Sequence, residues 1–271
     1  MSGWTKAHES IKQALVGRTG VRVLVVEGAD DARFFKELLD RKAPGAWQTG
    51  WAVGSANGKQ NVLRILEAEP DWIGIVDRDE WSNRAVIDAE SKHPNLHVLP
   101  RFCMESYFLL ANELWAALLP FNQGKVSGGE AAFRDAIHAE TASWVRHGAL
   151  WHAVNPLWDG LRAKGFKEAL LDLQAAQDDA VIQQKLREWH DHLEPTQIFA
   201  DFNRFHAAAS AESLENQLTQ WVHGKKRFTE HVVPVLNRLI GQQSADVWFK
   251  DLLRTMPVPA DLRPLWNKMN L

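Results

Sequence analysis

Short β-branched, apolar runs alternate with helix-like segments through residues 21–110 of the chain. The first run is 21–26, and three others lie at 47–53, 72–76 and 96–99. Buried parallel strands are nearly continuous in β-branched residues, and parallel strands need long crossovers between them, usually helices. The alternation therefore predicts an α/β domain whose parallel sheet has helices on both faces.

The strand signal stops after Glu105, and helical patterns continue toward the C-terminus. The predicted helices are 104–119, 129–147, 156–176, 178–193, 196–208, 211–223, 226–240 and 245–255. Asn155-Pro156 predicts a helix start, because proline is favoured at the first helical position. We predict an α/β domain over residues 1–112, beginning with a helix at 3–17, followed by an all-helical domain over 113–271.

Composition places the chain among globular proteins of the cytoplasm. Its 45% hydrophobic and 24% charged residues are typical of such proteins. No apolar run approaches the ~18 residues that a membrane-spanning helix needs, and the first residues lack the apolar core of a signal peptide. Cys103 is the only cysteine, which excludes an intramolecular disulfide and fits a reducing compartment. We therefore predict a cytoplasmic protein with no membrane partner.

The charge balance limits how such a chain interacts with nucleic acid. With 31 basic and 34 acidic residues, the net charge is −3. A protein that coats nucleic acid is usually basic, because counterion release drives that binding; an enzyme that touches a few phosphates remains compatible. Thirteen tryptophans stand against one tyrosine, and six of them at helical spacing are predicted to fill the core. These are Trp115, Trp144, Trp158, Trp189, Trp221 and Trp248.

Acidic residues follow two of the predicted strands. Glu27-Gly28 ends the first strand, while Asp77 and Asp79 end the third. Parallel sheets bind ligands at the carboxyl ends of their strands, and in an extended segment residues two apart point to the same side. An isolated D-x-D is more often a turn or a helix cap, but a second acidic strand end favours a site for a hard cation, Mg²⁺ or alternatively Mn²⁺.

A glycine-bearing loop precedes the helix that follows the second strand. A Walker A motif needs four residues between its glycines, then lysine and serine or threonine. Here three residues separate Gly54 from Gly58, and Gln60 follows Lys59, so ATP hydrolysis is not supported. Such a loop can still hold one phosphate at a helix N-terminus. We hypothesise that Lys59 contacts the scissile phosphate as a catalytic and substrate-binding residue; the alternative is a solvated lysine.

The densest basic run is Lys225-Lys226-Arg227. Such a run contacts a nucleic-acid backbone as a substrate-binding patch or binds an acidic partner; the alternative is that it is simply solvated. The eleven histidines form no H-E-x-x-H motif, and no G-x-S-x-G elbow is present. Zinc hydrolase and serine hydrolase chemistry are therefore not indicated.

Two segments that carry the acidic residues resemble a known family. Residues 25–31 (VVEGADD) and 75–79 (IVDRD) are similar to the TOPRIM domain of topoisomerases, primases and overcoming-lysogenization-defect (OLD) nucleases. Residues 58–62 (GKQNV) and 104–109 (MESYFL) more narrowly resemble a bacterial family with a TOPRIM-like core and a helical C-terminal half. Its best-known type is the effector subunit of PARIS anti-phage systems. The resemblance covers about residues 21–110 and is weak beyond them.

The resemblance implies a role for each acidic residue. Glu27 matches the general acid/base or a metal ligand, and Asp77 and Asp79 match the pair that holds Mg²⁺. Asp31 and Glu105 match further acidic positions that join the metal site in related nucleases. The structural alternative for both residues is a role at the start of a helix; Asp31 lies in a first turn, where the helix dipole favours a carboxylate.

The resemblance also implies an activity and partners. It implies a nuclease, a toxic effector of antiviral defence, that an ABC-type ATPase encoded beside it keeps inactive. RNA, particularly tRNA, is the expected substrate ahead of DNA; a homodimer is left open. A topoisomerase is rejected, because Tyr107 is the only tyrosine and strand passage needs a longer chain. A primase lacks support, because no zinc-binding cysteines are present.

Two other functions compete with the nuclease. One is a non-catalytic TOPRIM-like module used for assembly or binding, with the helical half as a docking surface. The other is a haloacid-dehalogenase-like phosphatase, which also places D-x-D after a strand and uses the first aspartate as nucleophile. The phosphatase leaves Glu27-Gly28 unexplained.

Overall fold

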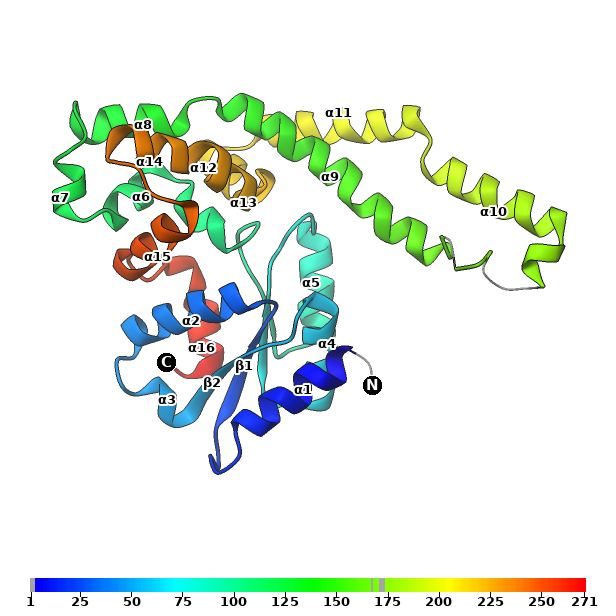
Figure 1. Cartoon of the computed structure of the whole chain (residues 1–271), viewed down its shortest axis with the longest axis horizontal. Coiled ribbons are helices and arrows are strands. Elements are labelled where there is room, and N and C mark those ends of the chain that lie inside the picture. Colours follow the sequence, from blue (N-terminus) through cyan, green and yellow to red (C-terminus); the bar gives the residue numbers. More distant parts are fainter. Residues whose placement is uncertain (1–2, 167, 171–173) are drawn as a thin grey trace. The chain divides into compact units, whose positions relative to one another are not determined.

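The computed structural model describes residues 3–166, 168–170 and 174–271 of the chain (Figure 1). Internal contacts divide the chain into two compact units. The first unit consists of residues 1–139 and 224–271, and the second of residues 140–223. The second unit is thus an insertion between two parts of the first.

The first unit contains a four-stranded parallel sheet with the order β2-β1-β3-β4. The strands are β1 (Arg22–Val26), β2 (Trp51–Ser55), β3 (Ile73–Val76) and β4 (Leu96–Val98). The predicted parallel sheet is therefore confirmed. The predicted strand at 47–53 begins later than expected, because Trp47–Gly50 forms the short helix α3 before the chain enters β2.

Helices cover both faces of this sheet. They are α1 (Gly3–Ala14), α2 (Ala29–Lys42), α4 (Lys59–Ala68) and α5 (Asn83–Lys92). Val23 and Val25 of β1 pack in one cluster with Ile11 of α1 and Ile65 of α4. Alternate strand residues point to opposite faces, so the fully buried Leu24 lies on the other face, the one that α2 covers (Figure 1).

The chain after β4 adds helices to the same unit. Before the insertion these are η1 (Met104–Phe108, a 3₁₀ helix), α6 (Ala111–Ala117), α7 (Pro120–Gln123) and α8 (Gly129–His138). After it come α13 (Gly224–Arg227), η4 (Phe228–Val232, a π-helix), α14 (Val233–Leu239), α15 (Ala245–Thr255), η5 (Ala260–Leu262) and α16 (Arg263–Met269).

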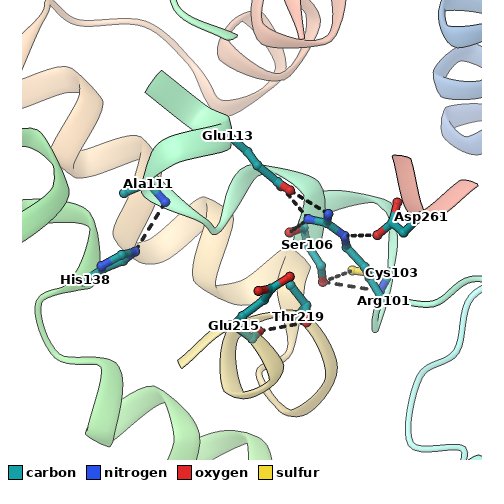
Figure 2. Close-up of polar contacts among 9 residues, drawn as sticks. All are labelled: Arg101, Cys103, Ser106, Ala111, Glu113, His138, Glu215, Thr219 and Asp261. Atoms are coloured by element: carbon teal, nitrogen blue, oxygen red, sulfur yellow. Dashed lines mark hydrogen bonds and ion pairs between the residues drawn. The ribbon is translucent and has the colours of Figure 1, made fainter. Parts of the chain in front are cut away.

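The predicted boundary between residues 112 and 113 does not coincide with the division seen in the structure. Figure 2 shows the buried Arg101 between Glu113 of α6 and Asp261 of η5, at 2.6 Å and 2.8 Å. In addition, Trp51 Nε1 of β2 donates to the carbonyl oxygen of Met269 at 3.2 Å. These long-range contacts hold the C-terminal helices in the same unit as the sheet. Hydrophobic periodicity in the sequence does not predict such contacts.

The second unit is built from helices. These are α9 (Thr141–Ala163), η2 (Ala175–Gln177), α10 (Asp179–His192), α11 (Pro195–Ala211), α12 (Leu214–Asn216) and η3 (Gln217–Trp221, a π-helix). A small core joins Ala149 and Ala153 of α9 to Phe202 of α11. None of the described helices is long and apolar enough to span a membrane.

Two helix predictions for this region are wrong. Pro156 does not start a helix but lies inside α9, where it has no N–H to donate to the helix. The predicted helix 129–147 is two helices, because Glu140 adopts a φ of +58° between α8 and α9. Residues 167 and 171–173 of the predicted helix 156–176 lie outside the described residues.

The tryptophan prediction holds only in part. Trp248 and Trp189 are buried, at 1% and 9% exposure. Trp158 is 50% exposed and is not a core residue. The other three, Trp115, Trp144 and Trp221, are partly buried.

Gly148 gives a test of packing inside the second unit. A methyl group at this position of α9 would lie 2.1 Å from the carbonyl oxygen of Trp221, a backbone atom that cannot turn aside. We expect Gly148→Ala to lower the free energy of unfolding by about 3 kcal/mol, the upper end of the usual overpacking cost, measured by calorimetry. Gly50→Ala is the control, since its new methyl meets nothing within 4 Å; equal stability of both variants would contradict this packing.

Candidate active site at the carboxyl edge of the sheet

The acidic residues after β1 and β3 lie side by side because these two strands are hydrogen-bonded neighbours. Glu27 follows β1 directly and Asp77 follows β3 directly. The backbone N–H of Asp77 donates to Oε1 of Glu27 at 2.8 Å. The structure therefore joins two residues that are fifty positions apart, as their places at parallel strand ends predict.

Asp79 reaches the same edge by a turn. Its φ is +50°, and its N–H donates to the carbonyl oxygen of Phe102 at 2.9 Å. Asp79 thus lies in a turn and not in an extended strand, so strand alternation is not what brings it to this edge. The turn is fixed by the chain that follows β4, a tertiary contact.

Lys59 supplies a positive charge at this edge. It is the first residue of α4, and its Nζ lies 2.6 Å from Oδ2 of Asp79. The same ammonium group lies 4.5 Å from the centre of the Trp81 ring, a cation–π contact. The side chain is only 14% exposed. Lys59 is therefore a structured part of the site, and the solvated-lysine alternative does not describe it.

Asp31 and Glu105 border the same cluster. Asp31 lies in the first turn of α2, where its Oδ2 accepts from the N–H of Gly28 at 2.7 Å. The capping role weighed for Asp31 is therefore present. Glu105 lies in η1 and is 8% exposed. Both carboxyls influence the ionisation of Asp77, which places them within electrostatic reach of it.

Burial and crowding raise the pKa of three carboxyls here. Burial raises the pKa of Glu27 to about 7, although the nearby Lys59 opposes the shift. Burial, followed by the negative charge of Glu105, raises the pKa of Asp31 to about 6 against the Gly28 hydrogen bond. Burial and the charges of Asp31 and Asp79 hold the pKa of Asp77 well above its usual range. Carboxyl groups that lie close together with too little positive charge nearby have raised pKa values.

The donor chemistry of the cluster fits a hard divalent cation. Glu27, Asp77 and Asp79 offer carboxyl oxygens only, which Mg²⁺ and Mn²⁺ prefer. A cation would relieve the charge repulsion that helps to raise the pKa values of Glu27 and Asp77. Within residues 3–166, 168–170 and 174–271, however, no three carboxylate, histidine or cysteine side chains are already arranged as a metal-ligand set. Asp79 is held by Lys59 instead.

The basic run does not act as one patch. Lys225 is exposed and lines a cavity of about 110 Å³ together with Glu105. Lys226 is paired with Glu230 at 2.8 Å. Arg227 is fully buried, and its Nη2 donates to the carbonyl oxygen of Ile137 at 2.9 Å near the end of α8. The prediction that Arg227 binds substrate is therefore wrong, since its guanidinium group stabilises a helix end.

Sequence reasoning missed Trp81 and Arg101. Trp81 lies two positions after Asp79 and contacts Lys59. A tryptophan within a polar loop is the sequence signal that could have identified it. Arg101 fixes the segment that carries Glu105, because its Nη1 also donates to the carbonyl oxygen of Ser106 at 3.4 Å (Figure 2). Cys103 and Tyr107 are buried, so neither is placed to act as a nucleophile.

Fold and site together define an α/β protein with a carboxylate-rich site and one ordered lysine at the carboxyl edge of a parallel sheet. No protein-family model matches the chain, and neither a curated protein nor a solved structure is significantly similar to it.

Proposed function

We propose that this protein is a Mg²⁺-dependent nuclease of the TOPRIM type, which hydrolyses phosphodiester bonds with water as the nucleophile. The observation that carries the proposal is the meeting of Glu27, Asp77, Asp79 and Lys59 at one edge of the sheet. Three acidic side chains from two strand ends are costly to bring together at a partly buried site, and metal-dependent phosphate chemistry accounts for them.

Each acidic residue of the cluster is assigned a role that follows from its chemistry. Asp77 and Asp79 would hold the metal ion, with Glu27, Asp31 or Glu105 completing the set. When bound, Mg²⁺ polarises the phosphoryl oxygens and neutralises charge that develops during hydrolysis. Glu27 moves the proton, because a carboxyl with a pKa of about 7 gains and loses one readily at neutral pH.

Lys59 would neutralise a non-bridging phosphate oxygen. Its ammonium group is within the cluster and donates to Asp79 at 2.6 Å. With Asp79 holding the metal ion, Lys59 would exchange its ion pair with Asp79 for one with the substrate phosphate. Lys225, which is exposed beside Glu105, would contact the backbone of the nucleic acid.

The family resemblance is the basis for proposing a cellular role, a partner and a substrate for the nuclease. It supports a toxic effector of bacterial antiviral defence in the cytoplasm, kept inactive by an ABC-type ATPase, with RNA, particularly tRNA, as the first substrate to test and DNA as the second. A near-neutral protein with local basic residues suits a structured RNA that is recognised by shape.

A non-catalytic assembly module is the second candidate. The observation that favours it is the Lys59–Asp79 ion pair, which supplies a positive charge at the place where a nuclease needs a metal. In such a module the pair would be permanent, and added Mg²⁺ would leave both the stability and the structure of the site unchanged.

The test compares the wild type with Glu27→Gln in Mg²⁺ or Mn²⁺, using total RNA and plasmid DNA as substrates. We expect cleavage by the wild type and a loss of about 10²–10⁴-fold in the variant, the usual contribution of a general acid or base. Glu67→Gln, which removes an exposed carboxylate of α4, is the matched control. Folding of each variant is checked by circular dichroism.

The same proteins separate the alternatives. A phosphatase would hydrolyse p-nitrophenyl phosphate, retain activity in Glu27→Gln and lose it in Asp77→Asn. A docking module would cleave neither nucleic acid in either metal. Full nuclease activity in Glu27→Gln would also overturn the proposed mechanism.

A further inference from the structure

Strand β2 lies at one end of the sheet and pairs only with β1 among the described strands. The N–H of Ala56, just after β2, donates to the carbonyl oxygen of Val26 in β1 at 2.9 Å. In a parallel ladder, residues alternate between bonding toward one neighbour and toward the other side. Gly54 therefore bonds toward β1, while Val53 and Ser55 direct their N–H and C=O groups away from the sheet.

A hollow of about 720 Å³ follows this outer edge. Every residue of β2 lines it, including Ala52 and Gly54 from one face and Val53 and Ser55 from the other. Because alternate residues of a strand point to opposite faces, a hollow that touches both sets lies along the edge itself. Its volume exceeds that of a single side chain and accommodates a short extended segment.

Residues of three helices line this hollow along the edge of β2. Residues of α1, Ile11 among them, line one side. α1 packs closely over the face of β2, because a Cβ on Gly54 would come within 2.8 Å of Ile11. Lys36 of α2 and Trp47 of α3 line the other side. The walls are thus partly apolar, and the polar backbone of β2 lies between them.

The charged lining of the hollow is basic. Arg18 and Lys36 line it, and no aspartate or glutamate is among its described lining residues. The Nη2 of Arg18 donates to the carbonyl oxygen of Gln48 at 2.7 Å and, more weakly, to that of Trp51 at 3.4 Å. Arg18 and Lys36 are both exposed. Acidic side chains complement this pair.

We propose that the β2 edge binds an extended, acidic segment of a partner protein, which adds to the sheet as a fifth strand. The outward groups of Val53 and Ser55 supply the backbone hydrogen bonds, the apolar walls take alternate side chains, and Arg18 and Lys36 pair with the acidic ones. Main-chain bonds then provide affinity and the side-chain contacts provide selectivity. This surface lies beside the proposed nuclease site, since Ser55 Oγ donates to the carbonyl oxygen of Glu27 at 3.5 Å, but the proposal does not depend on nuclease activity.

The experiment uses a fluorescein-labelled hexapeptide of alternating glutamate and valine and measures its binding to the full-length protein by anisotropy. We expect saturable binding. A peptide with lysine in place of glutamate, and one N-methylated at alternate residues, should each bind about tenfold more weakly, since the first loses the charge pairs and the second the backbone bonds.

Charge reversal on the protein provides the matched variants. Lys36→Glu should weaken binding of the acidic peptide about tenfold and strengthen binding of the lysine peptide. Lys6→Glu, an equally simple reversal at an exposed site of α1 outside the hollow, should change neither. In hydrogen exchange, the acidic peptide should protect the amides of Val53 and Ser55.

Three results would overturn the proposal. One is the lack of saturable binding by the acidic peptide. The second is binding that leaves exchange at Val53 and Ser55 unchanged, which would mean charge attraction without strand addition. The third is self-association of the protein alone that protects the same two amides, which would assign this edge to a second copy of the chain.

Discussion

Glu27→Gln should gain stability over the wild type as the pH rises, in the absence of metal. Glu27 has a pKa of about 7 in the folded protein against 4.5 as its ordinary value. A carboxyl whose pKa is raised by folding stabilises the protein fully below pH 4.5, and this stability is lost as the pH rises through 7. Glutamine keeps the Oε1 acceptor for Asp77 N–H but cannot ionise.

The expected size follows from the difference between these two pKa values. Between pH 4.5 and pH 8.5 the stability of Glu27→Gln relative to the wild type should increase by about 3 kcal/mol, because a tenfold change in an ionisation constant corresponds to about 1.4 kcal/mol. Urea unfolding in EDTA across this pH range measures it. Both proteins retain Asp31 and Asp77, whose raised pKa values act in the same direction and cancel in the comparison to first order.

Metal should offset most of this stability difference at high pH. At pH 8, Mg²⁺ at a hundred times its dissociation constant should stabilise the wild type by about 2.7 kcal/mol and Glu27→Gln by much less. Glu67→Gln is the control for both measurements. Parallel pH curves for the wild type and Glu27→Gln would contradict the buried position of Glu27, whereas a missing Mg²⁺ effect alone would contradict only the metal site.

Arg101→Ala should be among the most destabilising single substitutions of the sheet unit. The guanidinium group makes two bonds to Glu113, at 2.6 Å and 2.8 Å, and one to Asp261 at 2.8 Å, and it lies 4.1 Å from the centre of the Tyr107 ring. Its side chain is 7% exposed. Removing it leaves two carboxylates without their cation.

We expect Arg101→Ala to lower the free energy of unfolding by about 3 kcal/mol, the lower end of the range for a broken buried ion pair. The effect is at the lower end because Glu113 and Asp261 are about a third exposed, so water partly screens their charges. Arg101→Lys should recover only part of this loss, since lysine cannot make the two-bond contact with Glu113. Arg84→Ala, which breaks an exposed pair with Asp88, should cost less than about 0.5 kcal/mol. Equal costs for Arg101→Ala and Arg84→Ala in urea unfolding would refute this interpretation.

The sheet and its acidic edge could be predicted from the sequence. The β-branched runs at 21–26 and 72–76 are local patterns, and parallel connection puts the residues after them at a common edge. Glu27 and Asp77 therefore meet as predicted. The sequence also singles out Lys59, because a glycine loop with a lysine at a helix N-terminus can hold a phosphate, but it does not predict the ion pair of Lys59 with Asp79.

Other features of the site and fold depend on contacts between distant residues. The turn at Asp79 is set by Phe102, and the burial of Arg227 is set by a carbonyl group ninety positions earlier. A run of three basic residues looks the same in sequence whether its side chains are solvated or buried. The division into two units likewise follows from contacts such as Arg101 with Asp261.

The sequence by itself determined the parallel sheet, the helices that surround it and which acidic residues follow its strands, because hydrophobic periodicity and strand ends are local properties. The tertiary structure alone decided that Lys59 neutralises Asp79, that Arg227 supports a helix end and that the last helices return to the sheet. Those outcomes depend on which groups are brought together when the chain folds, and burial then sets their charge and their partners.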